Sequence, residues 1–242
     1  MHIIKLSATD STNDYLKQLH KEKSLDNYTI VTTLSQTNGK GQMGTHWVSQ
    51  EGKNLTFSVL LKNISTIQNS IFDYNVAVAV SIVQVLQALE LPNLNIKWPN
   101  DILSENKKVG GILIENSVKA DGTIDSIIGI GLNVNQDDFS DLPMASSLKN
   151  VADKTFDLDE LLLQLVYQIE TNLNQISSHK ETYWKIYIKY LFKINVPMAF
   201  EDQHQSRFMG IITGVTDEGK LSVMLEDDST QYFTLKEIRL LY

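Results

Sequence analysis

The longest apolar stretch in the chain, residues 73–91, constrains the fold more than any other feature. It is rich in valine and runs too long without glycine or proline for a strand, so we predict a buried helix. Its most apolar part, residues 76–91, is interrupted by four polar residues and falls well short of the roughly 18 uninterrupted apolar positions of a membrane span: Ser81, Gln84, Gln87 and Glu90. With 42% hydrophobic and 21% charged residues over 242 positions, the chain can build the packed core that this helix requires.

Composition and charge narrow the class of protein. The chain has no cysteine, which excludes disulfides, thiolate metal sites and cysteine nucleophiles and fits a cytoplasmic location. Residues 1–14 contain neither a basic segment nor a sustained apolar one, so no export signal is expected. The 21 Lys and Arg residues against 29 Asp and Glu residues give a net charge of −8. We therefore expect a protein that binds neither nucleic acid nor membrane.

The remaining pattern predicts an α+β fold with a mixed, largely antiparallel sheet and flanking helices. A helix is expected to begin at Ser11, which can cap it. The region 94–134 is typical of an antiparallel meander, because turn signals separate its three β-rich runs. The predicted strands, rich in β-branched and apolar residues, are 3–6, 28–34, 55–61, 94–98, 109–115 and 124–134.

Residues 157–242 contain two helix-capping patterns, followed by a segment of short strands and turns. Asp157 with Glu160, and Ser178 with Glu181, predict two successive helices that cover one face of the sheet. From residue 195 onward, short strands alternate with turns, which is typical of a small β-barrel. We expect two domains, residues 1–190 and 195–242.

A polar segment, residues 35–53, lies between two predicted strands and is the first candidate site. Gly39, Gly41 and Gly44 free its backbone to approach an anion, and Lys40 adds positive charge. The segment matches neither the P-loop nor the dinucleotide-binding fingerprint. The alternative is a hairpin loop with a packed Trp47.

Three further segments place polar residues at strand ends. In residues 96–101, Pro99 breaks the strand, and Asp101 could hold a hydrated Mg²⁺ or a hydroxyl group. Lys108 begins a strand before two glycines, where its charge could stabilise an anionic transition state. Residues 128–133 form a glycine-bearing strand that ends in Asn133. The alternatives are an ordinary turn for the first segment and a solvated lysine for the second.

The order and spacing of these segments identify a resemblance. The matching residues are Ser11-Thr12-Asn13, Gln36 before the glycine loop and Trp47, Lys97-Trp98-Pro99-Asn100-Asp101, Lys108 before Gly110-Gly111, and Gly131-Leu132-Asn133. Together they resemble the biotin protein ligases, and the lysine seven positions after the Trp-Pro-Asn-Asp run is the most specific part. The resemblance covers residues 11–148, and the segment from 195 is similar to the family's small SH3-like domain. Only ten residues precede Ser11, so we expect the short form without a helix-turn-helix domain.

The resemblance implies a two-step reaction that uses biotin and ATP as substrates, with Mg²⁺. Biotin is first activated to biotinyl-5'-AMP and is then transferred to a lysine of a biotin carboxyl carrier domain. Lys108 is implied as the catalytic residue. The biotin-binding residues would be Ser11, Thr12, Asn13, Gln36, Lys40, Gly41, Gln42 and Lys108. The nucleotide-binding residues would be Gly39, Lys40, Gly44, Trp47, Asn100, Asp101, Lys108 and Asn133.

Further expectations concern assembly, metal binding and rival functions. A homodimer through a sheet edge is common in the family. No ligand spacing links the five histidines, so no protein metal site is predicted. The closest rival function is that of a lipoate or octanoyl ligase or transferase of the same fold. A transcriptional co-repressor, or a binding protein in which every segment is a turn, would also be compatible with parts of the pattern.

The glycine loop departs from the family pattern, which is rich in arginine. Lys40, Gln42 and Thr45 stand where arginines are usual, and the only arginines, Arg207 and Arg239, fall in the terminal segment. Lysine and glutamine cannot reproduce the bidentate phosphate contacts of arginine. We therefore hypothesise that the adenylate is held less tightly than in arginine-bearing relatives and is released into solution.

Overall fold

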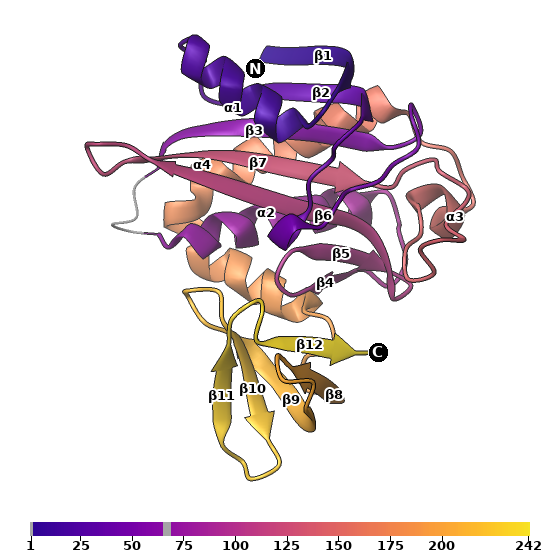
Figure 1. Ribbon diagram of the computed structural model, residues 1–242, viewed down its shortest axis with the longest axis vertical. Helices are drawn as coiled ribbons and strands as arrows, with labels where there is room; N and C mark the ends of the chain where they lie inside the picture. Colours follow the sequence, from indigo (N-terminus) through magenta and orange to yellow (C-terminus); the bar gives the residue numbers. More distant parts are fainter. Residues whose placement is uncertain (1, 65–68) are drawn as a thin grey trace.

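The computed structural model describes residues 2–64 and 69–242, which form two sheets with helices around the larger one (Figure 1). The larger sheet has seven strands in the order β1-β2-β3-β7-β6-β5-β4. They are β1 (His2–Thr9), β2 (Thr29–Gln36), β3 (Leu55–Ile64), β4 (Asn95–Lys97), β5 (Asp101–Ser104), β6 (Lys107–Val118) and β7 (Ile124–Leu132). Only β1 and β2 pair in parallel, so the predicted mixed, largely antiparallel sheet is confirmed.

The strands β4 to β7 form the predicted antiparallel meander, with one strand more than the sequence suggested. We predicted that the polar run at Asp101 ends a strand, whereas β5 begins at that residue and pairs with both β4 and β6. The break at Pro99 is a turn inside a hairpin, which returns the chain to the sheet immediately. Asp101 therefore lies at a fixed position in the sheet.

The two faces of the large sheet are covered by different helices. Val31, Leu60 and Ile127 pack on Leu16 of helix α1 (Thr12–Glu22). Successive side chains of a strand alternate between the two faces, so the residues next to these three point to the opposite face. There they form the main core with helices α2 (Ile71–Ala88) and α4 (Leu158–Tyr190). Figure 1 shows these two helices side by side behind the sheet. A short helix, α3 (Leu148–Ala152), follows β7.

Helix α2 confirms the prediction of a buried core helix. Its first turn carries a capping box in which Ser70 and Asp73 satisfy each other's backbone N–H groups. Among the described residues, it is the one helix long and apolar enough to cross a membrane, yet 72% of that window is buried inside the molecule. Its valines lie against the sheet and α4.

Helix α4 replaces the two helices that we predicted. The first predicted start is correct, since the Asp157 side chain accepts a hydrogen bond from Glu160 N. The predicted second start at Ser178 is instead a kink, where His179 leaves helical geometry with φ −124° and ψ 18°. The capping pattern at Ser178 involves only neighbouring residues. Tyr183 and Tyr187 beyond it pack in the core, so the segments before and after the kink remain one helix.

The C-terminal residues form a separate antiparallel sheet with the order β11-β10-β9-β8-β12. Its strands are β8 (Pro197–Asp202), β9 (Arg207–Val215), β10 (Leu221–Leu225), β11 (Thr230–Phe233) and β12 (Ile238–Leu241). The sheet is open, with β11 and β12 at its edges, so closure into the predicted SH3-like barrel is not confirmed.

Specific contacts attach the terminal sheet to the rest of the chain. Trp98 Nε1 donates to Gly219 O at 2.9 Å, and Ser70 Oγ donates to Asp217 O at 2.7 Å. Lys180 Nζ lies 2.9 Å from the buried Asp73 and 3.6 Å from Asp217. Because these contacts join the 217–219 turn to α2, α4 and the β4–β5 turn, they fix where the terminal sheet lies.

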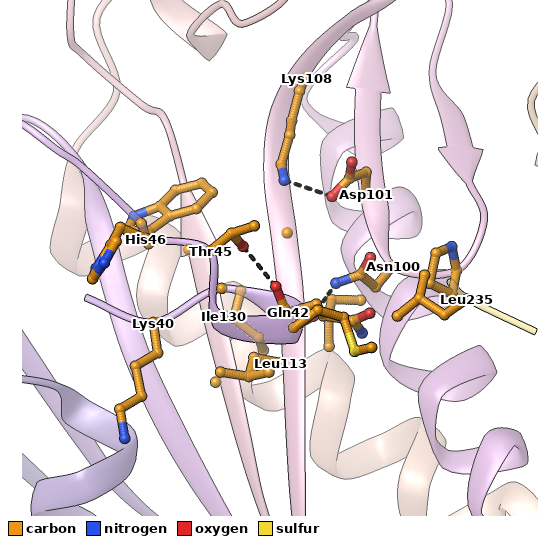
Figure 2. Close-up of a pocket in the computed structure, with 18 of the residues that line it drawn as sticks. Lys40, Gln42, Thr45, His46, Asn100, Asp101, Lys108, Leu113, Ile130 and Leu235 are labelled. Atoms are coloured by element: carbon orange, nitrogen blue, oxygen red, sulfur yellow. Dashed lines mark hydrogen bonds and ion pairs between the residues drawn. The ribbon is translucent and has the colours of Figure 1, made fainter. Parts of the chain in front are cut away.

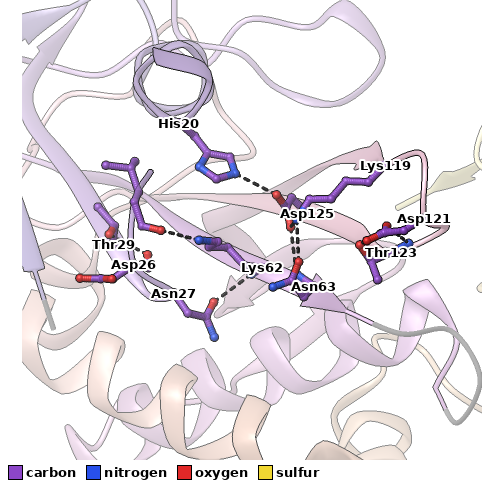
Figure 3. A network of polar contacts seen from close by, with 11 residues as sticks. His20, Asp26, Asn27, Thr29, Lys62, Asn63, Lys119, Asp121, Thr123 and Asp125 are labelled. Carbon is purple, nitrogen blue, oxygen red and sulfur yellow. Dashed lines mark hydrogen bonds and ion pairs between the residues drawn. The ribbon is translucent and has the colours of Figure 1, made fainter. Parts of the chain in front are cut away.

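A polar network joins α1 to β7 at the far end of the large sheet (Figure 3). Asp125 lies 2.8 Å from His20 Nε2 and 2.8 Å from Lys119 Nζ, and Asn63 N donates to it at 2.9 Å. Burial raises the pKa of this carboxyl, but the hydrogen bonds from Lys119, His20 and Asn63 outweigh burial and lower the pKa to about 2. Asp125 is therefore ionised in the folded protein across the neutral range.

The network predicts an acid-dependent contribution to stability. Because folding lowers the pKa of Asp125 from 3.8 to about 2, its contribution is complete above about pH 5 and is lost as the pH falls toward 2. We expect Asp125→Asn to cost about 2 kcal/mol in the free energy of unfolding at pH 7. Urea unfolding between pH 7 and 2 should show this difference shrinking with acid, with the exposed Asp141→Asn as control. A difference that stays constant over this range would contradict the assignment.

Candidate functional site

Most of the predicted site residues line one cavity of about 440 Å³ on the α1 side of the sheet (Figure 2). Those lining it are Ser11, Thr12, Asn13, Gln36, Lys40, Gly41, Gln42, Trp47, Asn100, Asp101 and Lys108. Gly39, Gly44 and Asn133 are not among the lining residues. Residues that are far apart in the sequence thus meet where α1, β2, the glycine loop and the meander converge.

Hydrogen bonds fix the polar side chains at the start of α1. The Ser11 side chain accepts from Asp14 N, which confirms it as the helix cap. The Gln36 carbonyl Oε1 accepts from Thr12 N at 2.8 Å and from Thr12 Oγ1 at 3.2 Å. Because both bonds use the Gln36 oxygen, its Nε2 group remains a donor for a bound molecule.

The Asn13 amide is held from three sides. Its Nδ2 donates to Glu115 Oε2 at 2.8 Å, and its Oδ1 accepts from Ser58 Oγ at 2.6 Å. Gly129 lies so close that a Cβ there would overlap the Asn13 amide. Neither Ser58 nor Glu115 was predicted as part of the site, because no local motif marks a residue that acts by holding another.

Lys108 and Asp101 form an ion pair inside the cavity. Their Nζ and Oδ1 atoms are 2.6 Å apart, and Figure 2 shows the two side chains pointing toward each other from β6 and β5. The backbone of Lys108 is fixed on its other side, where its N–H donates to Met144 O and its carbonyl accepts from Ser146 N. The ammonium group therefore lies at a defined position, next to the carboxylate.

Trp47 and Asn100 lie near this ion pair. Lys108 Nζ is 5.7 Å from the centroid of the Trp47 ring. A Cβ at Gly131 would come within 2.5 Å of that ring, so only glycine lets the indole approach β7 so closely. The Asn100 Nδ2 group donates to Ile112 O, which ties the β4–β5 turn to β6.

The ammonium group of Lys40 forms an ion pair outside the cavity. Its Nζ contacts Asp14 on α1 at 2.7 Å, and this hydrogen bond raises the pKa of Lys40. Figure 2 shows the side chain directed away from Lys108 and Asp101. Lys40 lines the cavity, and its contact with a bound phosphate stays a prediction that would require it to leave Asp14.

The central part of the glycine loop carries a backbone that few residues adopt. A short 3-10 helix, η1 (Gln42–Gly44), contains Met43 at φ 59° and Gly44 at φ 83°. Both values lie in the left-handed region, where glycine is favoured. Gln42 points into the cavity, and its buried Oε1 has no hydrogen-bond partner among the described residues.

The terminal sheet also lines the cavity, which was not expected from the sequence. Lys236 and Arg239 contribute from the segment that leads into and along β12, and Lys97 contributes from β4. Arg239 Nη2 donates to Glu201 Oε1 at 2.6 Å. Arg239 belongs to the terminal segment, as the sequence indicates, and pairing of β12 with β8 brings it to the cavity.

The described lining of the cavity has too few carboxylates for a protein metal site, but enough to contact a metal ion that is bound to a substrate. In the parts of the chain that the structure describes, no three His, Cys, Asp or Glu residues gather into a metal-binding group. Asp101 is the carboxylate residue in the cavity lining. Mg²⁺ is commonly bound by one or two carboxylates together with substrate phosphates, so Asp101 could take part in holding such an ion.

Comparisons with known proteins agree on one family. The family model described as the biotin/lipoate A/B protein ligase family matches residues 6–135. The bifunctional ligase/repressor BirA of Bacillus spizizenii is 32% identical over 225 residues, which cover 91% of this chain and 68% of the relative. The biotin–[acetyl-CoA-carboxylase] ligase of Mycobacterium tuberculosis is 24% identical over 220 residues, or 89% of this chain and 80% of the relative.

Solved structures give the same result. The biotin protein ligase from Aquifex aeolicus in complex with biotin and ATP has a TM-score of 0.82 and 27% sequence identity. The alignment covers 99% of this chain and 98% of that one. The similarity therefore includes the terminal sheet as well as the large one.

Proposed function

The chain belongs to the biotin/lipoate A/B protein ligase family, and from this premise we propose that it joins biotin to a lysine of a biotin carboxyl carrier domain. ATP activates biotin to biotinyl-5'-AMP, from which the carrier lysine takes the biotinyl group. One observation carries this proposal: a single cavity joins a polar end at Thr12, Asn13 and Gln36 to the Lys108–Asp101 ion pair.

In the first step, a carboxylate oxygen of biotin attacks the α-phosphorus of ATP. The new O–P bond forms as the bond to pyrophosphate breaks, and pyrophosphate leaves with the electron pair. Two anions must approach each other, so a fixed cation at their meeting point lowers the barrier. Lys108 supplies this charge, and the contacts of its backbone with Met144 and Ser146 support its placement. Asp101 holds the ammonium group until the substrates bind.

The polar end of the cavity binds the ureido ring of biotin. Thr12 occupies the Gln36 oxygen, and Gln36 Nε2 has no hydrogen-bond partner among the residues that the structure describes, so it can donate to the ligand. A buried ureido group needs partners for its N–H and C=O groups, and this end offers an amide and hydroxyls. A lipoyl ring has no such groups and would leave the same side chains unpaired, so lipoate ligation is the disfavoured alternative.

The other end of the cavity binds the nucleotide. We infer that Trp47 packs against adenine and that Asn100 and Asp101 face the phosphates, with Mg²⁺ arriving as part of the ATP substrate. Asn133 is supported in an indirect role, because its Nδ2 donates to Ser146 O in the segment that holds Lys108. The glycine loop would close over the adenylate and exclude water.

The division into domains remains part of the proposal. Residues 1–190 would form the catalytic domain and residues 195–242 a small domain that corresponds to the family's SH3-like domain. Its contribution of Lys236 and Arg239 to the cavity supports a role in substrate binding.

Two measurements test the proposed function. Biotin-dependent exchange of labelled pyrophosphate into ATP reports the first step, and mass spectrometry of a carrier domain reports the second. We expect both activities with biotin and neither with lipoate. Carrier modified by lipoate in preference to biotin would favour the alternative.

Gln42→Arg is expected to reduce release of biotinyl-AMP from the enzyme. An arginine would add bidentate, charge-assisted contacts to the phosphate, each worth about 1.5–3 kcal/mol, so release should slow by about tenfold or more. The assay supplies biotin and ATP without a carrier and measures free adenylate. Gln50→Arg adds the same charge outside the cavity lining and serves as control. Undetectable release from the unmodified chain would contradict the hypothesis of weak retention.

A further inference from the structure

A second cavity, of about 360 Å³, adjoins the substrate cavity. It lies between the start of α2, the strand β6 and two turns of the terminal sheet. Gln42, Trp98, Pro99 and Leu235 line both cavities. The two spaces are therefore neighbours separated by a few shared side chains.

The second cavity is lined by apolar residues of the catalytic sheet and its helix, and by charged residues of the terminal sheet. Ile71, Phe72 and Ile114 contribute apolar surface, whereas Glu218 and Lys220 are charged residues from the 216–220 turn. Hydrogen bonds, first that of Thr216, lower the pKa of Glu218, so it carries a negative charge at neutral pH. The bond between Trp98 Nε1 and Gly219 O fixes the turn beside the catalytic sheet.

The shared residue Gln42 offers an unused acceptor. Its Oε1 is buried and has no partner among the residues that the structure describes, although buried polar atoms are normally paired. Its side chain belongs to the lining of both cavities, and Figure 2 shows it in the first of them. A donor that arrives through the second cavity would complete this hydrogen bond.

We propose that the second cavity is the channel through which the acceptor lysine of the carrier domain reaches the adenylate. This inference rests on the proposed function. The adenylate would occupy the first cavity, from its polar end to Trp47, so the attacking amine needs a separate approach. A lysine side chain matches the channel in chemistry: its methylene groups suit Phe72 and Ile114, and Glu218 attracts its ammonium group against the repulsion from Lys220 of the same turn.

The channel also favours the reactive form of the lysine. Apolar surroundings disfavour a charged ammonium group and so promote loss of a proton to solvent as the side chain enters. The neutral nitrogen then attacks the acyl carbon of the adenylate, and the C–O bond to phosphate breaks. AMP leaves with the electron pair, and the nitrogen loses a second proton to solvent as the amide forms. Gln42 Oε1 can accept a hydrogen bond from the incoming amine.

Two exposed positions allow the channel to be altered without disturbing the core. Glu218→Lys reverses the charge at its mouth, and Thr234→Trp places a large side chain in its lining. Glu226→Lys and Thr230→Trp make the same changes at positions of the same sheet that do not line either cavity. All four proteins are compared with the unmodified chain, with a biotin carboxyl carrier domain as acceptor.

We expect both channel variants to raise the KM for the carrier domain at least tenfold and both controls to leave it unchanged. Biotin-dependent pyrophosphate exchange, measured on the same samples, should stay within twofold and shows that the proteins are folded. An unchanged KM for the carrier in both channel variants would overturn the channel. Absence of pyrophosphate exchange in the unmodified chain would instead overturn the proposed function, so the two failures are distinguishable.

Discussion

Lys108→Ala is expected to slow biotinyl-AMP formation by about a hundred- to a thousandfold, the typical loss when one preorganised charge-stabilising group is removed. The variant leaves no cation at the point where the biotin carboxylate meets the α-phosphate. It also leaves Asp101 without its partner at 2.6 Å, and this adds a repulsive charge beside the phosphates. Biotin-dependent pyrophosphate exchange measures the effect directly.

Lys107→Ala provides a matched control for this prediction. Lys107 precedes Lys108 on the same strand but is exposed and does not line the cavity. Its replacement should leave exchange and transfer unchanged. Full activity of Lys108→Ala would mean that the first step does not depend on this ammonium group, and the mechanism proposed above would be wrong.

Two glycines on β7 are expected to separate the binding of the two substrates. A methyl group at Gly129 would overlap the Asn13 amide, whereas one at Gly131 would come within 2.5 Å of the Trp47 ring. Gly129→Ala should therefore raise the KM for biotin, and Gly131→Ala should raise the KM for ATP. We expect each effect to be on the order of ten- to a hundredfold, as for other small displacements of positioning groups.

The comparison needs a glycine whose replacement should have no effect on either substrate. For Gly214, on β9 of the terminal sheet, no heavy atom of another described residue beyond its chain neighbours lies within 4 Å of the position that a Cβ would take. Gly214→Ala should keep both KM values. Equal changes in both constants for Gly129→Ala and Gly131→Ala would show that the two ends of the cavity are not separate subsites.

Local patterns were sufficient to predict much of the fold. The buried helix α2, the start of α1 at its Ser11 cap and the antiparallel meander all follow from periodicity and turn residues within short windows. The errors occurred where a local signal competed with packing. The cap signal at Ser178 produced a kink rather than a helix start, and the run after Pro99 continued the sheet as β5.

The site was predictable to a similar extent. Most residues that the family resemblance singled out line one cavity, although their individual roles remain predictions. The site residues that were not predicted are of two kinds. Ser58 and Glu115 hold Asn13, and Arg239 and Lys236 reach the cavity from the terminal sheet. Neither kind leaves a local pattern, because its partners lie tens of residues away in the chain.

Most helices and strands could be predicted from the sequence, because periodicity and caps are properties of neighbouring residues, and the family resemblance supplied most residues of the substrate cavity. The distribution of charge around that cavity followed only from tertiary packing. The shortage of arginine in the glycine loop suggested that Lys40 would serve the phosphates, yet its ammonium group pairs with Asp14. Pairing of β12 with β8 brings Arg239 to the cavity instead. Electrostatic contacts depend on distance in space, and that distance is fixed only when the two sheets pack together.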